Sequence, residues 1–153
     1  MPYSESLYHF TDSRNIPSIK EHGLYSFAAL KAKLELDDGT DFYPASSETS
    51  REIDFRKNLH NYIRLCSEQN HPMVTIAMNE NRINSVSWIK LDFSEIVFKN
   101  NFRERHVLFS NINAASNNAV VNDNYSTFTQ SHDIQREVLV RFNIPASQLE
   151  FIE

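Results

Sequence analysis

The chain has 153 residues, which at about 150 residues per domain predicts a single domain spanning residues 1–153. Hydrophobic residues make up 41% of the chain and aromatic residues 12%, so a disordered or low-complexity protein is excluded. The chain has 15 Lys and Arg against 20 Asp and Glu, and its net charge of −5 excludes a protein that coats nucleic acid with a uniformly basic surface, although not one with a local basic groove.

The first part of the chain predicts one strand followed by helices. Residues 7–11 form a strand-like run, and a short helix over residues 16–22 ends at Gly23, which occupies the place of a left-handed cap residue. Helical spacing of apolar residues continues over 27–36. Ser47 then has the position of a helix N-cap.

The second part of the chain is dominated by predicted strands. These lie at residues 63–66, 74–78, 86–91, 96–98, 107–109 and 137–142. Residues 111–120 are compatible with a helix, and residues 122–133 are polar and rich in turn formers. Helices first and strands later favour an α+β domain over an array of βαβ units.

The residue inventory also excludes several kinds of site. Gly23 and Gly39 are the only glycines, so no glycine-rich phosphate loop is present. The six His residues lack zinc-binding spacing, and no Ser lies in a nucleophile elbow. Cys66 is the only cysteine and lies in an apolar run, so we expect a buried thiol and no internal disulfide.

With no targeting leader and no apolar run near the ~18 residues of a membrane span, we expect a soluble cytoplasmic protein.

A dispersed set of polar residues remains for chemistry. The set comprises His9, Thr11, Arg51, Gln135 and Glu137. Glu137 begins a predicted strand after a polar loop, where a carboxylate could stabilise a cationic transition state or accept a proton. The alternative from the pattern alone is a solvated strand carboxylate without a function.

Four sequence blocks occur in an order that matches a known family. They are Tyr8-His9-Phe10-Thr11 with residues 15–24, residues 47–65 with Arg51, His71-Pro72-Met73, and residues 135–145 with Glu137. Together they resemble the DarT-type (DUF4433) DNA ADP-ribosyltransferases. The blocks at residues 47–51 and 71–73 are more similar to the branch that modifies guanine than to the thymine branch.

The resemblance implies a fold, a reaction and partners. The fold would be an α+β ADP-ribosyltransferase fold, in which two packed, mostly antiparallel sheets form an NAD cleft with helices on its flanks. The reaction would transfer ADP-ribose from NAD, without a metal, to guanine or thymine in single-stranded DNA. The protein would act as a toxin, and an antitoxin that removes ADP-ribose would be its partner.

The resemblance also implies roles for individual residues. Glu137 would be the catalytic acid or base, and Arg51 a catalytic contact near the pyrophosphate or the base. The residues expected to bind NAD are His9, Thr11, Asn15, Gly23 and Leu24. Positive charge, rather than the resemblance, gives the residues expected to contact nucleic acid, because single-stranded DNA needs a limited cationic track. These are Arg56, Lys57, Arg64 and Arg136, with Arg103 and Arg105 as further candidates.

Two other hypotheses stay open at this stage. The first keeps the fold but transfers ADP-ribose to RNA or protein, because loops rather than the fold determine the acceptor. The second is a catalytically silent module that keeps an NAD-shaped or nucleic-acid-binding surface. The presence of both Arg51 and Glu137 argues against the second hypothesis, since losing either residue would be the simplest inactivating step.

Overall fold

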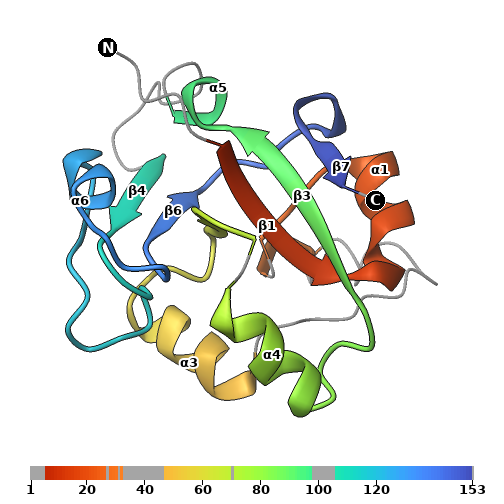
Figure 1. Cartoon of the computed structure of the whole chain (residues 1–153), viewed down its shortest axis with the longest axis horizontal. Helices are drawn as coiled ribbons and strands as arrows, with labels where there is room; N and C mark the ends of the chain where they lie inside the picture. The colour runs from red at the N-terminus through yellow and green to blue at the C-terminus, as the bar shows by residue number, and fades with distance from the viewer. Residues whose placement is uncertain are drawn as a thin grey trace.

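The computed structural model describes residues 6–26, 28–30, 32, 47–69, 71–97 and 106–152 (Figure 1). The predicted α+β class is confirmed. In chain order the elements are β1 (Ser6–Asp12), η1 (Ser13–Asn15), α1 (Ile16–His22), α3 (Glu48–Arg56), β2 (Ile63–Cys66), α4 (Pro72–Asn79), β3 (Val86–Asp92), α5 (Phe93–Val97), β4 (Val107–Ser110), β5 (Val121–Asn122), α6 (Ser126–Thr129), β6 (Glu137–Val140), η2 (Ala146–Gln148) and β7 (Glu150–Ile152).

The described strands form one antiparallel sheet in the order β5-β4-β6-β2-β1-β3-β7. The predicted division into two packed sheets is therefore not confirmed. The physical reason lies in β1, which hydrogen-bonds to β3 along its whole length and to β2 at its other edge. The link from β1 to β2 is short, with the register pair Tyr8↔Cys66, whereas β2 and β6 pair over four residues.

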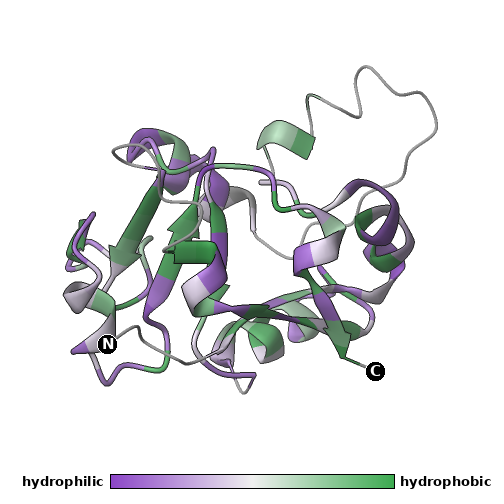
Figure 2. Ribbon diagram, turned by 90° about the horizontal axis from the view of Figure 1, so that it is seen from above, coloured by the Kyte–Doolittle hydropathy of each residue, from purple (hydrophilic) through white to green (hydrophobic). Residues whose placement is uncertain are grey.

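The helices lie around the edges and ends of this sheet. Figure 1 shows α3 and α4 together beyond one end of β1, α6 next to β4, and α1 beside β7. Apolar residues are concentrated on the strands, and polar residues on the loops and the outer helices (Figure 2). Among the described residues no helix has the length and apolar composition needed to cross a membrane.

Successive side chains of β2 and β6 alternate between the two faces of the sheet. On β2, Ile63 and Leu65 are 3% and 0% exposed and belong to the main hydrophobic cluster, while Arg64 between them is partly exposed. On β6, Val138 and Val140 are fully buried in the same cluster. Because successive side chains of a strand point to opposite faces, β2 directs Arg64 away from this core.

Gly23 ends α1, as predicted, and its backbone has φ +91°. A Cβ at this position would lie 2.5 Å from the carbonyl oxygen of Ile144. The close approach arises because Leu24 and Ile144 exchange two backbone hydrogen bonds of 2.8 and 2.9 Å. Glycine is therefore needed here both for its conformation and for space.

Three predicted elements are wrong, and one lies mostly outside the described residues. Residues 74–78 lie in helix α4 because Pro72 occupies its first turn and His71 caps it. Residues 93–97 form helix α5, where Asp92 accepts the backbone N–H of Glu95, and residues 111–120 form turns rather than a helix. The helix predicted over residues 27–36 lies largely outside the described residues.

Candidate functional site

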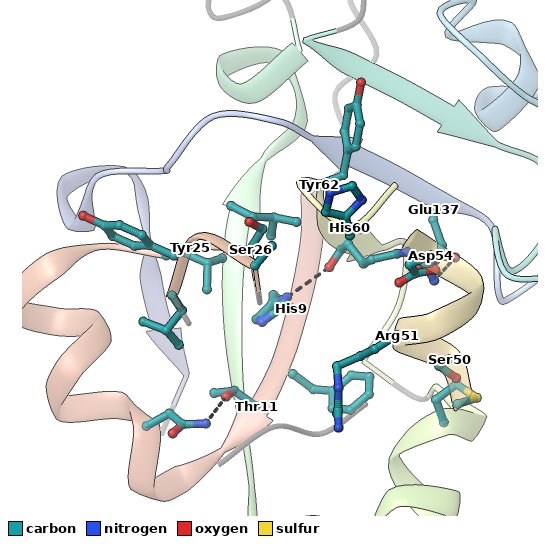
Figure 3. Close-up of a pocket in the computed structure, with 18 of the residues that line it drawn as sticks. His9, Thr11, Tyr25, Ser26, Ser50, Arg51, Asp54, His60, Tyr62 and Glu137 are labelled. Atoms are coloured by element: carbon teal, nitrogen blue, oxygen red, sulfur yellow. Dashed lines mark hydrogen bonds and ion pairs between the residues drawn. The ribbon is translucent and has the colours of Figure 1, made fainter. Parts of the chain in front are cut away.

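A cavity of about 1050 Å³ lies between β1, α1, α3 and the adjoining ends of β2 and β6 (Figure 3). Single small-molecule sites usually span roughly 300–1,000 Å³, so this cavity has room for a large ligand or for two reactants. The predicted residues that line it are His9, Thr11, Asn15, Gly23, Leu24, Arg51, Arg56, Arg64 and Glu137. All seven residues predicted for catalysis or NAD binding thus meet at one place, and their roles stay predictions.

Glu137 is the first residue of β6 and is only 7% exposed. Its Oε1 accepts the backbone N–H of Ala114 at 2.7 Å and Nη1 of Arg64 at 3.3 Å. No hydrogen bond to Oε2 is found in the described part of the chain. Burial raises the pKa of Glu137, although the charge of Arg64 and the N–H of Ala114 oppose the change. A carboxyl group with a raised pKa accepts and donates protons more readily near neutral pH.

Arg64 connects Glu137 to a second carboxylate. Its Nη2 forms a short ion pair with Oδ1 of Asp54 on α3, while its Nη1 contacts Glu137. In the register of β2 against β6, Cys66 lies opposite Glu137. Arg64 is two residues before Cys66 on the same face of β2, so it lies diagonally opposite Glu137, within reach of a long side chain. Burial raises the pKa of Asp54 against the nearby charges of Arg64, Lys57 and His60.

Helix α3 supplies the opposite wall of this part of the cavity. The predicted N-cap is confirmed, since Oγ of Ser47 accepts the N–H of Ser50 at 3.1 Å. Arg51 and Asp54 are three residues apart and therefore share one face of the helix. Figure 3 shows Arg51 extending from α3 into the cavity. Asp54 was not singled out from the sequence, although its spacing from Arg51 on one helix face is a signal that could have found it.

His9 lies on β1 with its ring held in one tautomer. The distance from its Nδ1 to the carbonyl oxygen of Arg64 is 3.0 Å. Because a carbonyl oxygen only accepts, Nδ1 carries the proton, and Nε2 is left as an acceptor in the neutral ring. Burial lowers the pKa of His9, with the hydrogen bond to Arg64 opposing it. A neutral ring is therefore favoured in the cavity.

Thr11 and Asn15 form a buried pair next to His9. They are 6% and 2% exposed, and Nδ2 of Asn15 donates to Oγ1 of Thr11 at 3.0 Å. Because Thr11 accepts this bond, its own O–H remains able to donate. The cavity wall near β1 thus combines an acceptor on His9 with a hydroxyl donor on Thr11.

His71 is another histidine that lines the cavity, and its tautomer is opposite to that of His9. Its Nδ1 accepts the N–H of Met73 at 3.1 Å, which caps α4 and requires the proton to be on Nε2. Burial lowers the pKa of His71, although the charge of Asp133 opposes this. The ring of Phe10 packs against it with centroids 5.9 Å apart.

Two of the predicted nucleic-acid contacts do not line the cavity. The ammonium group of Lys57 donates to the carbonyl oxygens of Ala114 and Ser116, each at 2.7 Å. The guanidinium of Arg136 lies 5.0 Å from the ring centroid of the fully buried Phe128. Lys57 thus holds the segment around residues 114–116 in place, and Arg136 packs against helix α6. Arg103 and Arg105 lie outside the described residues.

Cys66 is a buried thiol at the cavity. The thiol of Cys66 is buried, as predicted, and the carbonyl oxygens of Tyr8 and Glu68, each 3.3 Å from Sγ, share its single S–H as acceptors. Burial raises the pKa of this thiol to about 12, so it is a poor nucleophile. Across the ranges that the structure describes, no group of three or more His, Cys, Asp and Glu side chains could hold a metal ion.

The sequence matches a family model over residues 5–91, more than half of its length. The chain belongs to DUF7002, a family of unknown function. This is not the DUF4433 family to which the sequence blocks were compared. No curated protein matches the chain.

Solved structures of DarT proteins are similar to this member of DUF7002. Thermosipho africanus DarTG in complex with ADP-ribose has a TM-score of 0.71 and 17% identity, over 95% of this chain and 43% of that chain. Thermus sp. 2.9 DarT in complex with ADP-ribosylated ssDNA has a TM-score of 0.70 and 13% identity, over 98% of this chain and 83% of that one. The same DarT in complex with NAD+ has a TM-score of 0.65 and 13% identity, covering 97% and 81%. At these identities the likeness is one of fold, and the chain spans less than half of the DarTG chain.

Proposed function

We propose that this DUF7002 chain transfers ADP-ribose from NAD to a base in single-stranded DNA. The observation that carries the proposal is the buried Glu137 carboxylate, held by Ala114 and Arg64 at the wall of a large cavity. Support comes from the solved chains with the same fold, which are complexes with NAD+ and with ADP-ribosylated ssDNA.

The chemistry fits one carboxylate with a raised pKa. The bond between C1′ of the ribose and the nicotinamide nitrogen breaks, and nicotinamide leaves as a neutral molecule. The ribose then carries oxocarbenium character, which a nearby carboxylate stabilises. A base nitrogen forms the new bond to C1′, and its proton passes to Glu137. Because Glu137 uses Oε1 for both of its described bonds, Oε2 is assigned the contact with the reactants.

NAD would occupy the part of the cavity near β1 and α1. His9 offers Nε2 as an acceptor and Thr11 a hydroxyl donor, which suit a ribose and a carboxamide. Asn15 holds Thr11 in position, and Gly23 and Leu24 form the adjacent wall. Arg51 would offset the charge of the pyrophosphate by a bidentate contact.

The finer features of the proposal concern the biological role. The acceptor would be guanine or thymine, and the protein would act in the cytoplasm, where NAD and DNA are both present. Modified DNA bases block replication, so the chain would be a toxin, and an enzyme that removes ADP-ribose would be its antitoxin.

The test is transfer of label from NAD to a panel of acceptors. The purified chain would be incubated with labelled NAD and, separately, single-stranded DNA, duplex DNA, RNA and a bystander protein. Glu137→Gln should abolish transfer, whereas Glu150→Gln, which changes an exposed carboxylate on β7, should not.

Each outcome of this test has a defined meaning. Label on single-stranded DNA from the parent and Glu150→Gln, but not from Glu137→Gln, supports the proposal. Label only on RNA or protein overturns the DNA acceptor. No label on any acceptor, from a folded chain that binds NAD, overturns the transferase and favours a silent module.

A further inference from the structure

An exposed aromatic side chain lies at the edge of the cavity. Phe55 on α3 is 66% exposed, more than any other large hydrophobic side chain in the described ranges, and it lines the cavity directly after Asp54. A single exposed apolar residue is ordinary on a protein surface. The position of Phe55 beside the proposed reaction centre is what calls for an explanation.

The ring of His60 packs against the ring of Phe55. The two ring centroids are 4.8 Å apart at an angle of 40°, within the range in which aromatic rings attract each other. Nδ1 of His60 is buried, and no hydrogen-bond partner for it is found among the described residues. Phe55 and His60 therefore form an aromatic pair in which the Phe55 ring is exposed and Nδ1 of His60 is buried.

Phe55 and His60 line the cavity from other elements than the β1 and α1 residues proposed for NAD. The residues proposed for the ribose and carboxamide of NAD lie on β1, on α1 and just after it, and Arg51, proposed for the pyrophosphate, lies on α3. Phe55 lies one turn after Arg51, at the end of α3, and His60 lies before β2. Figure 3 shows His60 near Asp54 and Glu137, and Thr11 at the other side of the cavity. The acceptor must reach Glu137 from a direction that NAD leaves open, and α3 borders such a direction.

Basic side chains on the same helix as Phe55 suit a polyanion with flat apolar groups. Among the described lining residues, the basic and acidic groups are Arg51, Arg56, Arg64 and Arg82 against Glu52, Asp54 and Glu137. Arg64 pairs with Asp54 and Glu137, and Arg82 pairs with Glu80 outside the lining. The basic groups nearest to Phe55 along α3 are therefore Arg51 and Arg56. Proteins that bind single-stranded nucleic acid combine a positive groove with aromatic rings on which bases stack.

We propose that Phe55, supported by His60, is a stacking site for an unpaired nucleobase of the acceptor strand. The inference rests on the proposed function and adds a base-binding residue to it. Stacking requires only a flat π-face, so this site holds the strand beside Glu137 without selecting the base. Arg56, the next residue on α3, is exposed at the cavity and provides a contact for the flanking phosphate.

The test compares Phe55→Ala, Phe55→Trp and a matched control. Ile76→Ala shortens an exposed apolar residue on α4 that does not line the cavity. Two quantities are measured for each variant: the KM for a single-stranded oligonucleotide in the transfer assay and the KM for NAD. Direct binding of an oligonucleotide that contains 2-aminopurine, read by fluorescence quenching, is a third.

Phe55→Ala should weaken oligonucleotide binding roughly 5-fold to 150-fold, which corresponds to ~1–3 kcal/mol for one stacked base. The KM for NAD should not change. Phe55→Trp should retain binding and quenching, and Ile76→Ala should match the parent. Because Phe55 is exposed, thermal unfolding of Phe55→Ala should stay close to that of the parent.

Failure of this inference is distinguishable from failure of the proposed function. If the parent transfers ADP-ribose and Phe55→Ala has an unchanged oligonucleotide KM, the stacking site is wrong and the transferase stands. If the parent transfers nothing, the quenching experiment still decides, since equal binding by the parent and Phe55→Ala overturns the site. An equal loss in Phe55→Ala and Phe55→Trp also overturns it, because an aromatic ring would then not be what matters.

Discussion

The link from Asp54 through Arg64 to Glu137 predicts that Arg64→Met destabilises the chain in a pH-dependent way. The guanidinium contacts both carboxylates, whose side chains are 19% and 9% exposed, and the Arg64 side chain itself is 25% exposed. Removing one partner of a buried ion pair costs about 3–5 kcal/mol. Partial exposure of Arg64 favours the lower end, about 3 kcal/mol. For a chain of this size, that loss lowers Tm by about 6–12 °C.

The direction of the pH dependence follows from the two raised pKa values. Burial raises the pKa of Asp54 and of Glu137 above their ordinary values. Above pH ~4, the folded state then binds more protons at these groups than the unfolded state, so their contribution to stability falls as pH rises. Removing Arg64 takes away the charge that opposes this effect. The deficit of Arg64→Met should therefore be larger at pH 7.5 than at pH 4.

The assay is thermal and urea unfolding of four proteins. They are the parent, Arg64→Met, the double variant Asp54→Asn/Glu137→Gln, and the triple variant that combines all three substitutions. The cost of Arg64→Met should shrink when both carboxylates are neutral. Lys90→Met is the matched control, since Lys90 forms a 3.9 Å pair with the exposed Glu150, and such a pair contributes about 0–1 kcal/mol. A deficit of Arg64→Met that is independent of pH and unchanged in the neutral background would refute the bridging role.

Three further predictions concern stability. Asp12→Asn should lower the free energy of unfolding by about 3 kcal/mol, since the side-chain hydrogen bonds from Arg14 hold the pKa of the buried Asp12 far below its ordinary value. For the same reason, urea unfolding of the parent should show that stability is lost as pH falls below ~4. His71→Ala removes the cap of α4 and should cost ~1 kcal/mol by thermal unfolding. Because burial lowers the pKa of His71, the parent should lose this contribution as pH falls below ~6.5, whereas His71→Ala should not. Gly23→Ala should cost more than ~1 kcal/mol in urea, since its Cβ would meet the carbonyl oxygen of Ile144; equal midpoints would contradict this.

Local sequence signals predicted the elements that carry the site. The apolar runs at residues 7–11, 63–66 and 86–91 became β1, β2 and β3, since β-branched and aromatic residues favour strands. Gly23 and Ser47 marked the end of α1 and the start of α3, because caps act through neighbouring backbone groups. The same local reasoning failed at residues 74–78, where a short apolar run is compatible with either a helix or a strand.

The sequence by itself determined an α+β chain with a carboxylate at the start of a late strand and, through its ordered blocks, a resemblance to DarT-type enzymes. It did not determine that the strands join in one sheet, or that Arg64 lies between two carboxylates. Arg64 is 10 residues from Asp54 and 73 from Glu137. No local pattern relates residues so far apart, because the register of β2 against β6 and the packing of α3 set their distance. The tertiary structure therefore decided which charges meet, and with them the electrostatics of Glu137.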